Sequence, residues 1–407
     1  MSMNLTPSGE RMHISFFGCR NAGKSSLVNA FCSQKVSIVS DVLGTTTDPV
    51  GKSMELLPLG PVVITDTPGI DDEGALGNER IKRTREILRK TDIAILVVDG
   101  TKGKSASDEA LISLFNERDL PYIIALNKAD LSGKDISDNI LTDDDYKSGL
   151  ILNVSAANGF NIDLLKEITA RLTLREQKEN SIIGDIVTEG DTIILVVPID
   201  KAAPKGRLIL PQQQVIRDAL DHGVMPLVSR DSELKKALSA LSAPPSLVIT
   251  DSQVFKTVSR IIPDDIPLTS FSILMARYKG NLTPSVNGVF AIDSLEDDDC
   301  ILISEGCSHH RQCGDIGSVK LPALLKKYTG KNLNIRLSSG QEYPEDLSEF
   351  KLIIHCGACM LNPAEANFRY KKAEAAGVPI TNYGIAISYM NGILKRCINM
   401  LPEFKNV

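Results

Sequence analysis

The stretch Gly18–Ser25, GCRNAGKS, constrains this chain most, because it matches the pattern G-x-x-x-x-G-K-[ST]. The apolar run His13–Phe17 before it predicts a buried strand, and Ser26–Phe31 after it predicts the start of a helix. In a strand, loop and helix of this kind, backbone N–H groups and the helix N-terminus face bound phosphates. The sequence therefore predicts a phosphate-binding loop in an α/β domain.

The expected phosphate contacts come from this loop. Glycine lets the backbone fold closely around the phosphates, Lys24 is expected to reach the outer phosphates, and Ser25 is expected to ligate Mg²⁺. The residues that we expect to hold the phosphates are Gly18, Asn21, Ala22, Gly23, Lys24, Ser25 and Ser26.

Length and composition narrow the class of protein. A chain of 407 residues favours two or three domains, and 43% hydrophobic with 24% charged residues is typical of a globular protein. A formal charge of −6 argues against a general nucleic-acid surface. The segment Met1–Arg11 lacks an apolar signal region, and no apolar run approaches the roughly 20 residues that span a bilayer. We expect a cytoplasmic protein without membrane or nucleic-acid partners.

Two segments beyond the loop suit a nucleotide switch. The segment Gly44–Asp48 contains Thr46, whose hydroxyl could close onto Mg²⁺ when a γ-phosphate is present. The strand Val62–Thr65 leads into Asp66, Thr67, Pro68 and Gly69. A carboxylate at that strand end can hold the metal through water, and the Gly69 N–H can meet the γ-phosphate.

Alternating strands and helices follow, which predicts a mostly parallel sheet with helices on both faces. The strand Tyr122–Leu126 ends in Asn127-Lys128-Ala129-Asp130. The Asp130 carboxylate can accept hydrogen bonds from N1–H and the exocyclic amine of guanine, a pair that adenine lacks. Ser155–Gly159 follows the strand Leu150–Val154 and precedes the helix Ile162–Leu174.

These elements, in this order, resemble the translation-factor-like GTPases, especially the group of the tRNA-modification and Era-like GTPases. The resemblance implies that the base is held by Asn127, Lys128 and Asp130 with Ser155 and Ala156. It also implies that Thr46 and Asp66 serve the metal and that Gly69 senses the γ-phosphate.

Catalysis is expected to depend on Lys24, Asn21, Thr46 and Gly69. Ile70 stands where Ras-like GTPases place the glutamine that orients water, so intrinsic hydrolysis should be slow or assisted. Potassium-dependent relatives carry an asparagine at the position of Asn21, which implies a K⁺ ion that stabilises transition-state charge. A purely structural role for Asn21 in the loop is the alternative.

After the polar segment Lys178–Gly190, which we interpret as a linker, a small α/β unit follows. It contains the strands Thr192–Val197 and Ser246–Thr250 and no catalytic constellation. We expect this unit to serve assembly, for example dimerisation about a two-fold axis.

The last part of the chain holds six of the eight cysteines. Cys307 follows the strand Cys300–Ile303, and Cys356 and Cys359 follow the strand Lys351–Ile354, so all three are expected beyond the carboxyl ends of strands. With a neighbouring histidine they could form a Cys₃His zinc site or an iron-sulfur cluster with three cysteines. Ligand types alone slightly favour zinc.

The combination of a potassium-type GTPase domain, a small α/β unit, C-x-H and a later H-C-x-x-C resembles the HydF family of [FeFe]-hydrogenase maturation GTPases. The resemblance implies a [4Fe-4S] cluster on Cys307, Cys356 and Cys359 and a transient diiron subcluster. It also implies a homodimer or larger assembly, radical-SAM maturases as donors and apo-[FeFe]-hydrogenase as acceptor. For the fourth ligand we favour His309, with His355, Cys313 and an exogenous group as alternatives.

We therefore expect an α/β protein of three domains. These are a P-loop GTPase domain at 1–174, a small α/β dimerisation domain at 175–264 and an α/β cluster-binding domain at 265–407. The expected function is a GTP-hydrolysing scaffold for hydrogenase maturation. The alternative is an RNA- or ribosome-associated GTPase with a structural zinc domain.

Overall fold

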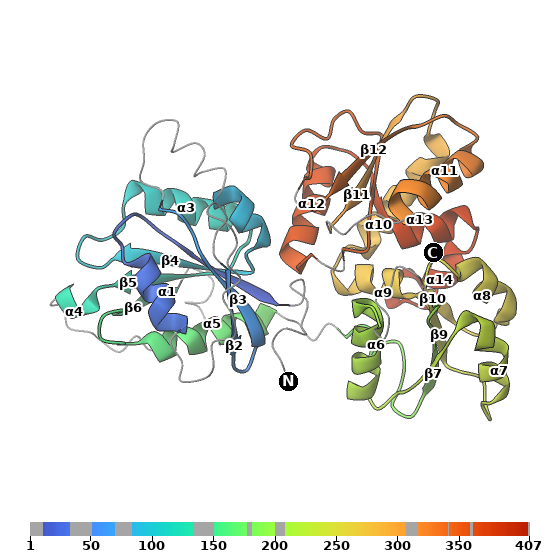
Figure 1. Cartoon of the computed structure of the whole chain (residues 1–407), viewed down its shortest axis with the longest axis horizontal. Helices are drawn as coiled ribbons and strands as arrows, with labels where there is room; N and C mark the ends of the chain where they lie inside the picture. Colours follow the sequence, from blue (N-terminus) through green and yellow to red (C-terminus); the bar gives the residue numbers. More distant parts are fainter. Residues whose placement is uncertain are drawn as a thin grey trace. The chain divides into compact units, whose positions relative to one another are not determined.

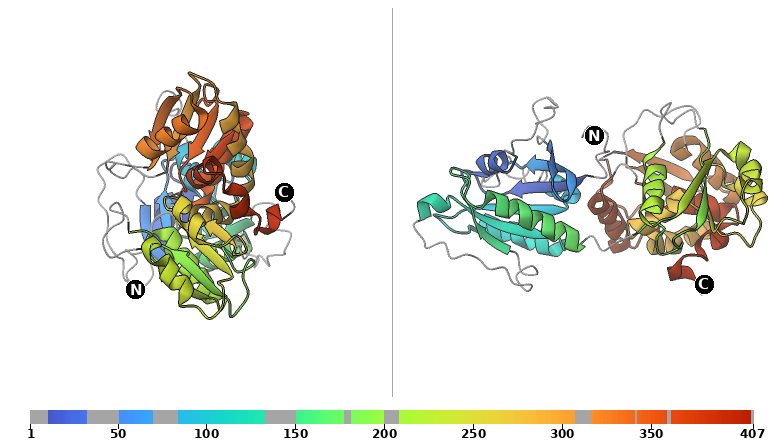
Figure 2. Two further views of the ribbon diagram at one scale, coloured as in Figure 1. Left: turned by 90° about the vertical axis from the view of Figure 1, so that its right-hand side faces the viewer. Right: turned by 90° about the horizontal axis from the view of Figure 1, so that it is seen from below.

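The computed structural model describes residues 11–32, 51–69, 84–132, 150–176, 181–199, 208–306, 316–340, 342–358 and 361–405 (Figures 1 and 2). The chain divides into two compact units, the first of Met1–Glu179 with Asn362–Glu365 and the second of Asn180–Leu361 with Ala366–Val407. Thr46, Ile70, Cys307, His309, Cys313 and Cys359 lie outside the described residues.

The first unit is built on a six-stranded sheet in the order β2-β3-β1-β4-β5-β6. All its strand pairs are parallel except β2 with β3. The expected mostly parallel sheet is thus present, and the antiparallel edge strand β2 is an addition that we did not predict. The strands are β1 (Met12–Phe17), β2 (Gly51–Leu56), β3 (Gly60–Asp66), β4 (Ile93–Asp99), β5 (Tyr122–Asn127) and β6 (Leu150–Asn153).

Helices cover both faces of this sheet. On one face, Phe31 of α1 and Leu165 of α5 belong to the core. On the other, Phe115 of α3 packs with Ile87 from the helical residues 84–90. The helices are α1 (Lys24–Cys32), α3 (Ala106–Glu117), α4 (Ala129–Ser132) and α5 (Ile162–Glu176).

The start of α3 shows how local sequence sets an element boundary. The Ser105 hydroxyl accepts a hydrogen bond from the Asp108 N–H at 3.2 Å, and the Asp108 carboxylate accepts one from the Ser105 N–H at 2.8 Å. This reciprocal capping satisfies backbone donors that the first helical turn leaves without partners.

The second unit contains two four-stranded parallel sheets. The first has the order β10-β9-β7-β8. Its strands are β7 (Thr192–Val196), β8 (Met225–Ser229), β9 (Leu247–Thr250) and β10 (Leu268–Ser270). Its helices are α6 (Leu210–Asp221), α7 (Leu234–Ser239), α8 (Phe255–Ile261) and α9 (Phe271–Tyr278).

The second of these sheets has the order β12-β11-β13-β14. Its strands are β11 (Cys300–Glu305), β12 (Asn334–Ser339), β13 (Leu352–His355) and β14 (Ile380–Asn382). Its helices are α10 (Leu282–Val289), α11 (Leu321–Thr329), α12 (Pro363–Ala375), α13 (Tyr383–Met390) and α14 (Leu394–Ile398).

Both sheets of the second unit contribute to one continuous hydrophobic core. Ile193 and Leu195 of β7 belong to it, as do Ile301 of β11 and Leu352 of β13, and all four are fully buried. The described residues thus form three sheets in two compact units, because the last two sheets share a core. The domain boundaries at 174 and 264 stay predictions.

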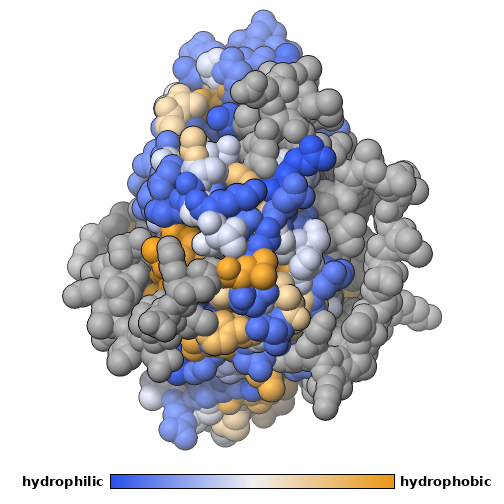
Figure 3. Space-filling view, turned by 90° about the vertical axis from the view of Figure 1, so that its left-hand side faces the viewer, coloured by the Kyte–Doolittle hydropathy of each residue, from blue (hydrophilic) through white to orange (hydrophobic). Residues whose placement is uncertain are grey.

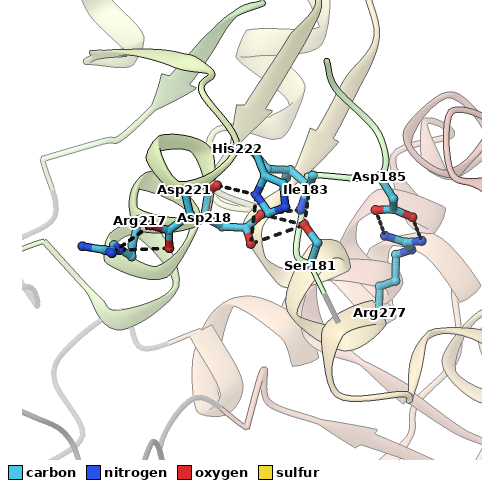
Figure 4. A network of polar contacts seen from close by, with 9 residues as sticks. Ser181, Ile183, Asp185, Arg217, Asp218, Asp221, His222 and Arg277 are labelled. Carbon is cyan, nitrogen blue, oxygen red and sulfur yellow. Dashed lines mark hydrogen bonds and ion pairs between the residues drawn. The ribbon is translucent and has the colours of Figure 1, made fainter. Parts of the chain in front are cut away.

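The segment after residue 180 is more than the polar linker that we expected. Ile183 is fully buried in the shared core. The carboxylate of Asp218 on α6 accepts hydrogen bonds from the Ile183 N–H at 2.8 Å and the Ser181 hydroxyl at 3.1 Å. Figure 4 shows these contacts together with His222, whose Nδ1 lies 2.8 Å from the Asp218 carbonyl. Asp185, on the same segment, forms an ion pair with Arg277 of α9 at 2.5 Å.

Replacing Asp218 by alanine is expected to lower the free energy of unfolding by about 1–3 kcal/mol, because it leaves a part-buried N–H without its acceptor. Hydrogen exchange at Ile183 should accelerate at the same time. The matched control is Asp221→Ala, which removes only an exposed pair with Arg217. Hydrogen exchange monitored by mass spectrometry on the full chain tests this, and equal exchange in both variants would show that Asp218 does not fix the segment.

No helix among the described residues is long and apolar enough to cross a membrane. On the face drawn in Figure 3, hydrophilic residues cover most of the coloured surface and hydrophobic residues form smaller groups between them.

Candidate functional site

The glycines of the first loop are required by close contacts. Gly18 has φ +142° and Gly23 has φ +85°, in the region that favours glycine. A Cβ at Gly18 would lie 2.3 Å from the carbonyl oxygen of Val97, and one at Gly23 would lie 2.3 Å from Nδ2 of Asn127. The loop therefore packs directly against the ends of β4 and β5, which fixes its path before α1.

Two of the residues that we expect at the magnesium site lie within hydrogen-bonding distance of each other. The Ser25 hydroxyl, at the start of α1, donates a hydrogen bond to Oδ2 of Asp66 at 2.6 Å. The buried Oδ1 of Asp66 has no hydrogen-bond partner among the described residues. Mg²⁺ prefers oxygen ligands. The Ser25 hydroxyl and the unpartnered Oδ1 of Asp66 are both oxygens, so these residues fit the ion. The third expected ligand, Thr46, lies outside the described residues.

Gly69 lies against the loop. A Cβ there would lie 2.7 Å from Cγ and 3.0 Å from the backbone nitrogen of Arg20. Only a glycine leaves this approach open, so the backbone of the segment after β3 reaches the phosphate-binding loop.

The expected guanine-binding residues are connected to each other and to the loop. The Asn127 amide donates to the Ala22 carbonyl at 3.0 Å, and its Oδ1 accepts from the Ala156 N–H at 3.1 Å. The Ser155 hydroxyl donates to Oδ1 of Asp130 at 2.6 Å. The structure thus brings the segments that we expect to bind the base and the phosphates together at the carboxyl ends of β1, β5 and β6.

Lys128 joins the same assembly through a residue that sequence reasoning missed. Its Nζ donates to Oδ2 of Asp99 at 2.7 Å and to the Asn21 carbonyl at 2.9 Å. Burial alone would raise the pKa of Asp99, but hydrogen bonds from Lys128 and Thr101 outweigh it and lower that pKa to about 2. The available signal was an acidic residue, Asp99, at the carboxyl end of the buried strand β4.

The backbone conformation of Asn21 by itself favours an asparagine, and its expected catalytic role stays a prediction. Its φ of +63° is in the left-handed region, where asparagine is better tolerated than most residues. The Lys128 contact holds its carbonyl in place. The backbone geometry therefore explains an asparagine here, and the K⁺ ligand stays a prediction.

In the second unit, Cys356 lies at the end of β13 beside the end of β11. Its N–H donates to the Ser304 carbonyl at 2.8 Å. Its Sγ accepts from the Gly306 N–H at 3.1 Å and from the Ala358 N–H at 3.4 Å. Backbone donors aimed at a sulfur stabilise the thiolate, which is the form that binds metal.

The turn after Cys356 contains a left-handed residue, and Lys279 donates hydrogen bonds to its carbonyls. Ala358 has φ +52°, which is unfavourable for a residue with a Cβ. The Lys279 ammonium donates to the Ala358 carbonyl and, at 3.3 Å, to the Leu361 carbonyl. A Cβ at Gly357 would meet nothing within 4 Å, so close packing does not require a glycine at this position.

His355, one of the alternatives for the fourth cluster ligand, is only 1% exposed. Its Nδ1 lies 2.8 Å from the Cys356 carbonyl. Burial and the charge of Arg369 lower its pKa to about 3, so the ring is neutral. Cys307, His309, Cys313 and Cys359 lie outside the described residues, and within the described part of the chain no three His, Cys, Asp or Glu residues form a metal-binding group.

Comparison with known proteins identifies the second unit. The hydrogen maturase F dimerization domain matches residues 182–280. The hydrogen maturase F tetramerization domain matches residues 283–400. Together these two domains cover more than half of the chain. The chain belongs to the hydrogen maturase F (HydF) family. The expected resemblance and the expected fold class are thus confirmed, and the two domain names support a homo-oligomer.

The first unit of this HydF chain is a GTPase domain, since the 50S ribosome-binding GTPase family matches residues 13–128. Over 160 residues the chain is 33% identical to the tRNA modification GTPase MnmE of Laribacter hongkongensis, covering 39% of this chain and 34% of that protein. Over 163 residues it is 38% identical to GTPase Der of Wolinella succinogenes, covering 38% and 34%. The alignments span about a third of the length of these relatives.

Among solved structures, GTPase Era of Aquifex aeolicus bound to GDP·AlF4⁻ is 20% identical with a TM-score of 0.33, covering 54% of this chain and 92% of that one. A GTPase domain implies binding of GTP and Mg²⁺, which the donor set of Ser25 and Asp66 fits.

Proposed function

We propose that this chain is a GTP-hydrolysing scaffold that binds a [4Fe-4S] cluster through Cys307, Cys356 and Cys359. In this proposal it carries a diiron subcluster precursor, received from radical-SAM maturases, to apo-[FeFe]-hydrogenase in the cytoplasm. Membership of the HydF family supports the maturation role.

The observation that carries the proposal is the surroundings of Cys356. The two N–H groups that point at its Sγ belong to Gly306 and Ala358, which are the direct chain neighbours of Cys307 and Cys359. The position of Cys307 and Cys359 in the sequence, directly beside these two donors, is what supports one shared cluster for the three cysteines. When bound, such a cluster supplies an iron that lacks a cysteine ligand and can accept an exchangeable one.

In the first unit, residues of the chain bind the phosphates and Mg²⁺ and select guanine. Lys24 neutralises charge on the outer phosphates, and Ser25 and Asp66 hold Mg²⁺, with Thr46 as its proposed further ligand. Asp130, oriented by Ser155, accepts hydrogen bonds from guanine. Because residue 69 is a glycine, its backbone can approach the phosphate site. A contact between this backbone and the γ-phosphate can change the conformation of the segment after Gly69.

Replacing Asn21 by glycine is expected to remove the preference for K⁺ over Na⁺ in GTP hydrolysis while GTP binding is retained. Glycine accepts the left-handed φ of +63°, so this change removes the side-chain carbonyl without straining the loop. The matched control is Asn161→Gly, at a left-handed asparagine with φ +56° in the same unit. Steady-state hydrolysis in KCl and NaCl measures the effect, and an undiminished K⁺ preference in Asn21→Gly would refute a K⁺ ligand at this position.

The carrier function is tested by hydrogenase activation. The protein is produced with the radical-SAM maturases or without them, purified anaerobically and mixed with apo-[FeFe]-hydrogenase, and hydrogen evolution is measured. We expect activation only by the protein made with the maturases. If neither preparation activates the hydrogenase and the purified protein binds zinc and RNA instead, the RNA-associated alternative replaces the proposal.

A further inference from the structure

A fully buried arginine connects the strand ends that surround Cys356. Arg369 on α12 is 1% exposed. Its Nη2 donates to the carbonyl of Gly340, just after β12, at 2.6 Å. Its Nη1 lies 3.4 Å from the hydroxyl of Ser304 on β11 and 3.1 Å from Nε2 of His355 on β13. One guanidinium thus contacts the carboxyl ends of three neighbouring parallel strands.

The arginine also determines the state of the histidine. A guanidinium has only donors, so Nε2 of His355 must accept, which places the ring proton on Nδ1. Nδ1–H then donates to the Cys356 carbonyl at 2.8 Å. Both ring nitrogens of His355 are therefore engaged within the protein, and neither presents a lone pair to the space around the Cys356 sulfur.

The contacts form a chain that ends at the sulfur. Arg369 orients His355, His355 holds the carbonyl of Cys356, and the backbone of the same turn directs the Ala358 N–H at Sγ. The Cζ atom of Arg369 lies over the ring of Tyr343, 5.0 Å from its centroid, which is within the range of a cation–π contact. A fixed buried cation favours added negative charge nearby more strongly than a solvated one.

We propose that Arg369 and His355 are positioning residues of the cluster site, and that His355 is not the fourth ligand of the cluster. Arg369 fixes the Cys356 turn through His355, and its charge makes the bound cluster easier to reduce. This inference rests on the proposed cluster-binding function. It adds that Arg369 sets the reduction potential of the cluster and that His355 is not one of its ligands.

The experiment uses the full chain, reconstituted anaerobically with iron and sulfide, and compares Arg369→Met, Arg369→Lys and His355→Asn with the wild type. Iron content, the midpoint potential by EPR-monitored titration and the ¹⁴N couplings in pulsed EPR are measured. The His355→Asn change removes the imidazole, which could ligate iron, but keeps an amide that can still donate to the Cys356 carbonyl. The control is Arg336→Met, which removes an exposed arginine of β12 that pairs with Glu349.

We expect Arg369→Met to shift the potential to more negative values and to lower the iron content. Arg369→Lys keeps the cation but cannot reach Gly340, Ser304 and His355 together. Its potential should therefore be close to that of the wild type, while its iron content should stay below the wild-type value. His355→Asn should keep the cluster and the wild-type ¹⁴N couplings, and Arg336→Met should match the wild type. If Arg369→Met does not fold, Arg369→Gln, which removes the charge but keeps an N–H donor, takes its place in the comparison of potentials.

Three results separate the inference from the proposed function. A wild-type chain that takes up no cluster contradicts the proposed function itself. A wild-type cluster with potentials unchanged in both Arg369 variants contradicts the role of Arg369. Loss of a strong ¹⁴N coupling in His355→Asn identifies His355 as a ligand and overturns its assignment as a positioning residue.

Discussion

Replacing Gly23 by alanine is expected to weaken GTP and GDP binding by more than about 100-fold, which corresponds to about 2.7 kcal/mol. The added Cβ would lie 2.3 Å from Nδ2 of Asn127, so either the loop or Asn127 must move. Asn127 contacts both the loop carbonyls and the Ala156 N–H, and its displacement would therefore disturb the phosphate and base sites together.

The control for this substitution is Gly60→Ala. Gly60 has φ +79°, close to the +85° of Gly23, but a Cβ at Gly60 would meet nothing within 4 Å. Both variants carry the backbone strain of a left-handed alanine, about 1–2 kcal/mol, and only Gly23→Ala adds the collision. Titration with a fluorescent GTP analogue measures the difference. Equal affinities in the two variants would mean that the loop is not the nucleotide site.

Replacing Asp130 by asparagine is expected to reduce GTP affinity by about 100-fold or more, because two charge-assisted hydrogen bonds to guanine are lost. The same variant should bind xanthosine triphosphate better than the wild type does, since xanthine carries a carbonyl where guanine has its amine, and the asparagine amide can donate to it. Competition between the two nucleotides is the measurement.

Ser155→Ala is a milder substitution at the same base-binding site. It removes the 2.6 Å hydrogen bond that orients Asp130 but keeps the carboxylate. We expect about a five-fold loss of GTP affinity, or about 1 kcal/mol, and no gain for xanthosine triphosphate. If Asp130→Asn retained its guanine preference, the base would be recognised by other residues.

Much of the first unit could be predicted because its chemistry is local in sequence. The loop from Gly18 to Ser25 fixes a strand before it and a helix after it, and the structure has β1 ending at Phe17 and α1 beginning at Lys24. Asp66 and Asn127 each end a buried strand, so parallel pairing alone brings them to the same edge of the sheet. The same rule predicted that Cys356 would leave β13 beside the end of β11.

The remaining features depend on contacts between distant segments. Nothing near Lys128 in the sequence indicates its pairing with Asp99, and nothing around Arg369 distinguishes a buried cation from an exposed one on a helix. The polar composition of Lys178–Gly190 hid the buried Ile183, because its core partners come from elsewhere in the chain. For the same reason the sequence could not show that the last two sheets share one core.

The central claim, a [4Fe-4S] cluster on this GTPase, is tested most directly by low-temperature EPR of the reduced, anaerobically reconstituted chain. Cys356→Ser is compared with Cys300→Ser, which makes the same change on the neighbouring strand β11. We predict a [4Fe-4S] signal in the wild type and in Cys300→Ser, and its loss or marked reduction in Cys356→Ser. Stoichiometric zinc with no cluster signal in the wild type, or an unchanged signal in Cys356→Ser, would contradict the claim.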